Sequence, residues 1–248
     1  MNLLVDIGNT RIKLALTERG RVADEWSSEA LEGEALDGWL AGRRVEKAIV
    51  SCTRAGEWEA AAAALLRPRV GRLVVFTPST PVPIGSDYLT PRTLGRDRLA
   101  AAVGAATLCP GRDVLVVDFG TAVTVDLVTA DGTFRGGCIS PGMRSRFRAL
   151  HEHTESLPLC GASDAAALVG RTTREAIEAG VMNSLTFEIE GYIARMREKF
   201  GDLYVIFTGG DAKCFAKRIK NTIFANCNLV FCGLDRILEF NASEEHLD

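Results

Sequence analysis

Apolar and polar residues alternate along the first part of the chain in a pattern that predicts a mixed sheet with helices packed against it. Five short runs are predicted strands: residues 2–7, 11–17, 21–27, 47–52 and 73–77. Residues 35–42 and 57–67 have helical spacing, and the second of these segments ends before Pro68. The order β-β-β-α-β-α-β is typical of an α/β architecture.

A connecting region follows these elements. Residues 77–91 include four prolines, which favour an ordered, extended connection without regular secondary structure. The charged residues of Gly95-Arg96-Asp97-Arg98 then precede an alanine-rich segment that is a predicted helix ending near Leu108. The sequence therefore places three charged side chains at the start of a helix.

The second half opens as the first half does. A predicted strand runs from Asp113 into Asp118, a second covers residues 121–129, and a third ends near Ile139. With 248 residues, the chain is long enough for two domains. We therefore expect two lobes, residues 1–110 and 111–248.

The rest of the second half alternates helices, strands and glycine-rich connections. Residues 136–143, GGCISPGM, are expected as a sharp crossing between the third strand and the next helix, which is either part of a ligand cleft or purely structural. A long helix is predicted from Gly170 to near Gly201, capped by Thr172 or Thr173. Apolar residues recur along it every four positions, at Ile177, Val181, Leu185, Ile189 and Ile193, which indicates a buried stripe and is compatible with a subunit interface.

Further elements complete the chain. Residues 203–208 are a predicted strand, and Gly209 and Gly210 separate it from a helix that ends near Lys217. Glycines between a strand and a helix N-terminus let a flat or anionic ligand approach the backbone. We expect a final strand at 228–231 and a final helix at 234–240.

One short motif occurs twice, 112 residues apart, as DIGNTRIK at residues 6–13 and DFGTAVTVD at residues 118–126. Each copy follows an apolar run and reads as a strand, a tight turn and a second strand. A single Asp-x-Gly is most often an ordinary hairpin turn. Two copies in matching contexts favour a phosphate site, because glycine lets the backbone approach a ligand and the strand-end carboxylates of Asp6 and Asp118 can hold a cation beside phosphates.

Composition and charge narrow the function. A net charge of -3 and an isoelectric point near 5.8 give no general attraction for nucleic acid or an anionic membrane. The sequence has no run of about 20 apolar residues, and its N-terminus lacks the basic region of a signal peptide, so we expect a cytoplasmic protein. The 7 cysteines form no C-x-x-C pair and are expected to be reduced, mostly buried small hydrophobic residues.

The combination of these motifs resembles a known family. Two Asp-x-Gly turns that open duplicated lobes, followed by a strand ending in IFTGGDA, are similar to the actin, hexokinase and acetate kinase superfamily. Within it, DIGNTRIK, YLTPRTLGRDR, DFGTAVTVD and GGCISPG resemble type III pantothenate kinases over nearly the whole chain. The resemblance implies an α/β fold of two ribonuclease H-like lobes with an ATP cleft between them.

The resemblance also implies the ATP-binding residues. Lys13 would offset negative charge that develops on the phosphates, and Asp6 would hold Mg²⁺, directly or through water. Asp118 corresponds to a monovalent-cation ligand, for K⁺ or NH₄⁺, and oxygen coordination suits either ion. The expected ATP contacts are Asp6, Gly8, Asn9, Thr10, Lys13, Gly120, Thr121, Gly209 and Gly210.

The acceptor side is implied in the same way. Asp97 would be the catalytic base, with Arg96 and Arg98 holding its carboxylate ionised, although a carboxylate at this position is commonly only a helix cap. A substrate that is itself a carboxylate needs an arginine such as Arg98. The expected substrate contacts are Tyr88, Gly95, Arg96, Asp97, Arg98 and Thr173.

These assignments imply transfer of a phosphoryl group from ATP to pantothenate, the first step of coenzyme A biosynthesis, by a homodimer that binds neither nucleic acid nor a membrane. Two alternatives stay open at this point. One is another small-molecule kinase of the same superfamily, and the other is a non-catalytic or regulatory member similar to a transcriptional accessory factor. A polymerising ATPase like actin is disfavoured by the chain length.

Overall fold

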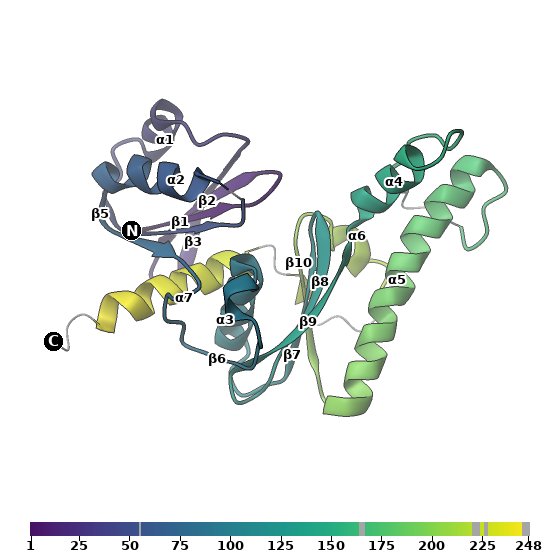
Figure 1. Ribbon diagram of the computed structural model, residues 1–248. Helices are drawn as coiled ribbons and strands as arrows, with labels where there is room; N and C mark the ends of the chain where they lie inside the picture. Colours follow the sequence, from purple (N-terminus) through teal and green to yellow (C-terminus); the bar gives the residue numbers. More distant parts are fainter. Residues whose placement is uncertain (55, 164–166, 220–223, 226–227, 245–248) are drawn as a thin grey trace. The chain divides into compact units, whose positions relative to one another are not determined.

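The computed structural model describes residues 1–54, 56–163, 167–219, 224–225 and 228–244 (Figure 1). The chain divides into two compact units. The first contains Met1–Pro110, Gly132–Phe134 and Asn228–Asp248, and the second contains Gly111–Asp131 and Arg135–Cys227. The expected lobes, 1–110 and 111–248, also divide the chain after residue 110. We expected the C-terminal segment in the second lobe, but Asn228–Asp248 belongs to the first unit.

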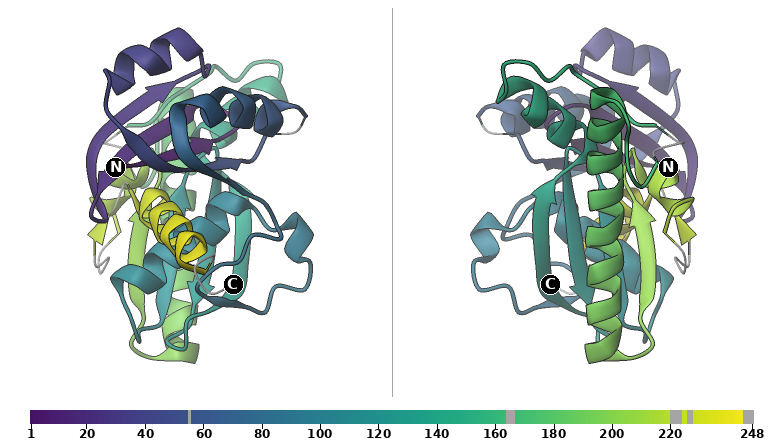
Figure 2. Two further views of the ribbon diagram at one scale, coloured as in Figure 1. Left: turned by 90° about the vertical axis from the view of Figure 1, so that its left-hand side faces the viewer. Right: turned by 90° about the vertical axis from the view of Figure 1, so that its right-hand side faces the viewer.

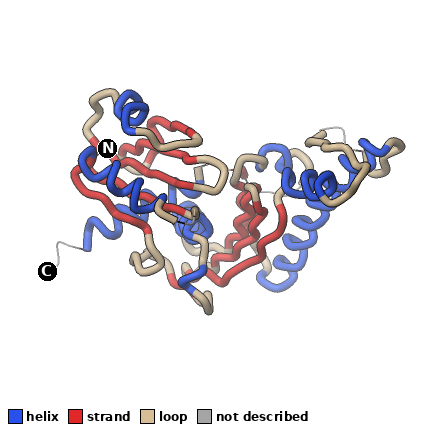
Figure 3. Tube along the Cα trace, turned by 45° about the horizontal axis from the view of Figure 1, so that its top comes forward, coloured by secondary structure: helices blue, strands red, loops and turns tan. Residues whose placement is uncertain are grey.

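The sheet of the first unit has the strand order β3-β2-β1-β4-β5. Its strands are β1 (Asn2–Ile7), β2 (Ile12–Glu18), β3 (Arg21–Ser28), β4 (Val45–Cys52) and β5 (Val70–Phe76). β1 pairs antiparallel with β2 and parallel with β4, and β4 pairs parallel with β5. Figure 3 shows these strands gathered into one sheet.

Helices cover both faces of this sheet. Leu3, Val5 and Ile7 of β1 pack in one apolar cluster with residues of α1 (Gly33–Leu40) and α2 (Trp58–Leu66). Leu4, between them, packs in a second cluster with α3 (Arg96–Leu108) and α7 (Leu229–Glu244). Successive side chains of a strand point to opposite faces, so Asp6 lies on the α3 and α7 side of the sheet.

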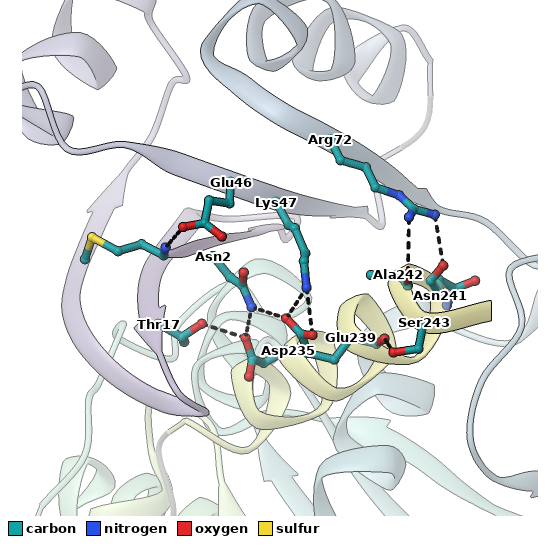
Figure 4. Close-up of polar contacts among 11 residues, drawn as sticks. Asn2, Thr17, Glu46, Lys47, Arg72, Asp235, Glu239, Asn241, Ala242 and Ser243 are labelled. Carbon is teal, nitrogen blue, oxygen red and sulfur yellow. Dashed lines mark hydrogen bonds and ion pairs between the residues drawn. The ribbon is translucent and has the colours of Figure 1, made fainter. Parts of the chain in front are cut away.

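The helix α7 corrects one expectation, because residues 229–231 begin this helix instead of forming the predicted strand 228–231. Its buried residues Phe231, Leu234 and Leu238 recur with helical spacing and pack on the sheet. Polar contacts also fasten α7 to the strands (Figure 4). Asp235 accepts hydrogen bonds from Asn2 at 3.0 Å and from Thr17 at 2.6 Å.

Short elements complete the first unit. A 3-10 turn at Arg67–Arg69 precedes β5, and another at Pro91–Thr93 precedes α3. The expected irregular connection at 77–91 includes one short strand, β6 (Gly85–Ser86). It pairs with Thr133 and Phe134 at the start of β9 (Thr133–Pro141).

The second unit repeats the strand plan of the first. Its strands are β7 (Val114–Phe119), β8 (Ala122–Val128), β9, β10 (Tyr204–Thr208) and β11 (Phe224–Ala225), and the whole sheet reads β11-β10-β7-β8-β9-β6. β7 pairs antiparallel with β8 and parallel with β10, and β10 pairs parallel with β11. The order β9-β8-β7-β10-β11 therefore matches β3-β2-β1-β4-β5, which confirms the duplication expected from the repeated motif.

Helices α4 (Met143–Glu152), α5 (Thr173–Phe200) and α6 (Ala212–Ala216) belong to the second unit. Figure 2 shows α5 running along one face of its sheet. The predicted stripe from Ile177 to Ile193 is buried in the unit's own core, so it is not available as a subunit interface. The expected crossing at 136–143 is instead mostly the end of β9, which extends to Pro141 before α4 begins. Among the described residues, no helix is long and apolar enough to cross a membrane.

Candidate active site

Each unit opens on a glycine turn between its first two strands. In the first turn the Gly8 N–H donates to the Arg11 carbonyl at 3.0 Å, and in the second the Gly120 N–H donates to the Ala122 carbonyl at 3.1 Å. The second turn is therefore one residue shorter than the first. Asn9, Thr10 and Thr121, which form the tips of these turns, are exposed to solvent.

The carboxylate that precedes the first turn lies in a row of polar side chains. Asp6 pairs across the sheet with Lys13 on β2 and with Ser51 on β4. Register partners project from the same face of a sheet, so these three side chains are neighbours. The buried Ser51 hydroxyl has no hydrogen-bond partner among the described residues. A partly buried carboxylate beside such an oxygen fits Mg²⁺, which prefers oxygen ligands and keeps several waters.

The second unit has the equivalent row. Asp118 pairs with Thr124 on β8 and with the buried Thr208 on β10. Gly209 follows Thr208 with a φ of 91°, in the left-handed region that favours glycine. A Cβ atom at Gly209 would lie 2.3 Å from Asp118 Oδ1. Gly209 is therefore in direct contact with the proposed cation ligand, so its first role is to leave room for that carboxylate.

Other backbone segments fix the second turn. The Gly142 N–H at the start of α4 donates to the Thr121 carbonyl at 3.1 Å, and the Ser145 hydroxyl donates to the same oxygen at 2.9 Å. The Asp211 N–H donates to the Phe119 carbonyl at 3.1 Å. The structure thus brings together Asp118, Gly120, Thr121 and the Gly209-Gly210 segment in the second unit.

The side chain of Asp211 adds a titratable group beside this turn. Burial raises the pKa of its carboxyl above 3.8, and the positive charge of Arg144 opposes that shift. Arg144 Nη2 lies 3.9 Å from Asp211 Oδ1, and its own side chain is 81% exposed. The sequence motifs did not identify Arg144, Ser145 or Asp211, because their relation to the turn arises only when α4 and α6 fold against it.

Asp97 lies in the first turn of α3. The N-cap of this helix is Gly95, which makes no side-chain capping bond, so Asp97 is not the capping residue that the alternative interpretation required. Its Oδ1 accepts a hydrogen bond from the Arg98 N–H at 2.8 Å, and the residue is partly exposed. The position of Asp97 leaves carboxylate oxygen available to a ligand, on a helix that covers the same sheet face as Asp6.

Arg96 makes two contacts that the motif did not predict. Its guanidinium forms an ion pair with Glu59 of α2 at 3.1 Å and a hydrogen bond to the Cys52 carbonyl at the end of β4. We expected Arg96 to keep the Asp97 carboxylate ionised, but its charge is directed to Glu59. Arg96 therefore ties α3 to α2 and β4.

Arg98 packs against two aromatic rings. Arg98 is only 6% exposed. Its guanidinium lies 5.6 Å from the centre of the Tyr88 ring and 5.8 Å from the centre of the Phe134 ring. The two rings are 5.9 Å apart. Stacking on aromatic rings holds a guanidinium in a fixed plane, the form suited to pairing with a carboxylate. Phe134 was missed in the sequence because it is far along the chain and reaches Arg98 only through the pairing of β6 with β9.

Thr173 is the first residue of α5, in the second unit. The capping residue is Thr172, whose hydroxyl accepts from the Glu175 N–H at 3.2 Å, while the Glu175 carboxylate accepts from the Arg171 N–H at 2.7 Å. Capping therefore does not explain Thr173, which is exposed. Its expected substrate contact stays a prediction.

Carboxylates, imidazoles and thiols do not assemble into a metal cage in the part of the chain that the structure describes, where no group of three such side chains could hold an ion. A cation at Asp6 or Asp118 would therefore complete its coordination with hydroxyls, carbonyls, water or phosphate oxygens. Such ligands suit hard cations.

Two units of one strand plan, each opening on an Asp-x-Gly turn, give the α/β fold of paired ribonuclease H-like units that the motifs predicted. The fold is shared with a Campylobacter jejuni protein assigned to the Baf family of transcriptional activators, with a TM-score of 0.65 at 20% identity over 97% of this chain and 98% of that one. It is also shared with the ethanolamine utilization protein EutJ of Carboxydothermus hydrogenoformans, with a TM-score of 0.52 at 14% identity over 95% and 89% of the two chains.

The sequence comparisons are more specific than the fold. The family model for type III pantothenate kinase matches residues 2–195. A type III pantothenate kinase of Phocaeicola vulgatus is 39% identical over 97% of this chain and 99% of its own length. One from Porphyromonas gingivalis W83 is 42% identical over 97% and 98%. The chain belongs to the type III pantothenate kinase family.

Proposed function

We infer that this protein transfers a phosphoryl group from ATP to pantothenate, giving 4'-phosphopantothenate in the first step of coenzyme A biosynthesis. The observation that carries this function is the matched pair of Asp-x-Gly turns in a chain that aligns over 97% of its length with type III pantothenate kinases. Transfer of this kind depends on positioning and charge neutralisation more than on covalent chemistry by the protein.

We propose that the two turns bind the ATP phosphates. The backbone N–H groups of exposed Asn9 and Thr10 in the first turn and of Thr121 in the second are of the kind that bind phosphoryl oxygens. Lys13 stands beside Asp6 in the sheet register, so its ammonium is suited to balance the charge of the phosphates. The exposed Gly210 is proposed to contact the nucleotide, supported by the open space that a Cβ atom there would meet.

The cations are proposed on the chemistry of the two carboxylates. Asp6 would hold Mg²⁺ beside the Ser51 hydroxyl, and Asp118 would hold K⁺ or NH₄⁺ beside Thr208. When bound, Mg²⁺ neutralises negative charge on the phosphates of ATP.

Asp97 is the proposed catalytic base. Its carboxylate would take the proton from the primary hydroxyl of pantothenate as that oxygen attacks the γ-phosphorus and ADP departs. Arg98, stacked on Tyr88, would pair with the pantothenate carboxylate and hold the hydroxyl at the far end of the substrate in reach of Asp97. The expected contact of Gly95 with substrate follows from its place at the N-terminus of the same helix.

The variant Asp97→Asn tests this role. Asparagine retains an oxygen that can accept from the Arg98 N–H, so the start of α3 is expected to stay intact. Turnover should fall by about 10²-fold or more, while binding of ATP and pantothenate, measured separately by calorimetry, stays within about threefold of the wild type. Asp202→Asn, at a side chain that is 82% exposed, is the matched control. Turnover of Asp97→Asn equal to that of the control would remove Asp97 from the base role.

A homodimer and a cytoplasmic location are further proposals that follow from the family. Within the second unit, Ile139 is 64% exposed and Phe187 is 55% exposed, and such large apolar residues are candidates for a subunit contact. Light scattering of the purified protein measures the mass. A mass of one chain at micromolar concentration would contradict the dimer.

A further inference from the structure

The two residues that follow β4, Thr53 and Arg54, form hydrogen bonds with backbone carbonyls of the first glycine turn. Thr53 donates to the Ile7 carbonyl through its N–H at 3.0 Å and through its hydroxyl at 3.2 Å. Arg54 Nε donates to the next carbonyl, that of Gly8, at 2.7 Å. Two successive carbonyls of the turn therefore have their hydrogen bonds supplied by Thr53 and Arg54.

The side chain of Arg54 is itself held in place. Its guanidinium lies 4.4 Å from the centre of the Trp58 ring, within the range of a cation–π contact. Trp58 is the first residue of α2, so the ring is anchored to a helix that packs on the sheet. A stacked guanidinium loses less freedom when it forms a hydrogen bond, because its plane is already fixed.

The bond to the Gly8 carbonyl has a consequence for the next amide. In a trans peptide the C=O of one residue and the N–H of the next lie in one plane and point in opposite directions. Since Arg54 binds the Gly8 carbonyl, the N–H of Asn9 points away from Arg54. The Gly8 N–H is already used inside the turn, in its bond to Arg11. Arg54 therefore sets the direction of the Asn9 N–H.

We propose that Arg54, held by Trp58, is a positioning residue for the ATP phosphates, which orients and polarises the Gly8–Asn9 peptide so that the Asn9 N–H donates to a phosphoryl oxygen. This inference rests on the proposed function for the binding of ATP at this turn. A cation on the carbonyl side of a peptide withdraws electron density and strengthens its N–H as a donor.

The second unit uses a different arrangement for its shorter turn. The Thr121 carbonyl accepts from the Gly142 N–H and the Ser145 hydroxyl, both of which are neutral donors. The charge of Arg54 thus distinguishes the first turn from the second. We expect substitution of Arg54 to affect ATP through the first turn alone and to leave pantothenate binding unchanged.

Two substitutions separate the hydrogen bond from the charge. Arg54→Gln retains an N–H donor without charge, and Arg54→Lys retains the charge without the planar guanidinium. Both are expected to raise the KM for ATP, by about tenfold for Arg54→Gln and less for Arg54→Lys, with the KM for pantothenate unchanged within about twofold. Trp58→Leu, which removes the stacking partner, should shift the KM for ATP in the same direction. Arg195→Gln, at a side chain that is 83% exposed, is the matched control.

A readout without turnover keeps this proposal distinct from the proposed function. In ¹⁵N-labelled protein without nucleotide, Arg54→Gln should shift the Asn9 amide resonance, and calorimetry should show weaker binding of Mg·ATP in the absence of pantothenate. If the wild type binds ATP but does not phosphorylate pantothenate, the proposed function fails while these two measurements still test Arg54. A KM and Kd for ATP equal to those of Arg195→Gln, or an equal loss for ATP and pantothenate, would overturn the proposal.

A general loss of folding would also raise an apparent KM, so the melting temperature is measured for every variant. Phenylalanine at position 58 keeps an aromatic face under Arg54 and is expected to restore most of the ATP affinity that Trp58→Leu loses. Failure of Trp58→Phe to do so in a folded protein would contradict the role given to stacking.

Discussion

Gly209 provides the sharpest test of how the second unit is built. The substitution Gly209→Ala adds a Cβ atom that would lie 2.3 Å from Asp118 Oδ1 and 2.7 Å from the backbone N and C of Phe119. The φ of 91° at this residue adds a conformational penalty of about 1–2 kcal/mol for any residue with a Cβ. Relieving the overlap requires movement of β7 or β10, and overpacking of this kind costs about 1–3 kcal/mol.

Two other glycines of the same unit separate these contributions. Gly111 has a φ of 70°, and a Cβ atom there would have no heavy atom of the described residues within 4 Å, so Gly111→Ala carries the conformational penalty alone. Gly210 has open space around it and no positive φ, so Gly210→Ala carries neither cost. We expect the free energy of unfolding to fall by about 2–5 kcal/mol for Gly209→Ala, by about 1–2 kcal/mol for Gly111→Ala and by less than about 0.5 kcal/mol for Gly210→Ala.

The assay is thermal unfolding of the three variants beside the wild type. For a chain of this length each kcal/mol corresponds to about 2–4 °C in the melting temperature, so Gly209→Ala should melt on the order of 10 °C lower. Because Asp118 must move, turnover of the folded variant with ATP and pantothenate should fall by about tenfold or more. A melting temperature of Gly209→Ala equal to that of Gly111→Ala would refute the close contact with Asp118.

Three further predictions concern the first unit. Arg98→Lys loses the planar guanidinium stacked on Tyr88 and Phe134, so the KM for pantothenate should rise by about tenfold or more with the KM for ATP unchanged, and an unchanged pantothenate KM would contradict the carboxylate pairing. Asp235→Ala removes the acceptor of the buried Thr17 hydroxyl and one of the two acceptors of Asn2, which keeps its bond to Glu239, and should lower the free energy of unfolding by about 2 kcal/mol, measured by urea titration against the exposed control Asp202→Ala. Burial raises the pKa of the Glu239 carboxyl, but hydrogen bonds from Lys47 and Asn2 outweigh it and hold the pKa below 4.5. A carboxyl whose pKa is lowered by folding stabilises the protein above pH 4.5, and this stabilisation is lost as the pH falls through the pKa of the folded state. Glu239→Gln should therefore be less stable than the wild type at pH 7 and equally stable well below pH 4.5. The same difference in stability at both pH values would contradict this linkage.

The sequence predicted the duplicated fold because the signal was local and occurred twice. The Asp-x-Gly turns and the alternating strands around them depend on residues close together in the chain, and β1 with β2 and β7 with β8 form as expected. The final strand at 228–231 was wrong because a short apolar run fits a buried strand or a buried helix equally well. Packing of Phe231 and Leu234 on the first sheet decides for a helix.

The candidate site was predictable to the extent that its residues belong to motifs. Asp6, Asp118 and Asp97 were identified with their elements, but the partners of neighbouring side chains were not. Arg96 lies next to Asp97 in the sequence, yet its guanidinium points to Glu59, since successive residues of a helix project in different directions. Arg54 was missed because its partner is distant in the sequence. Its single signal is a charged residue two positions after the end of a buried strand, and its partner Gly8 is 46 residues away.

The central claim is that this chain phosphorylates pantothenate with ATP. Its most direct test combines the purified protein with ATP, Mg²⁺ and pantothenate, with and without K⁺, and measures ADP release and the mass of the product. We predict stoichiometric ADP and 4'-phosphopantothenate, with faster turnover when K⁺ is present. Absence of ADP release in either salt would contradict the claim.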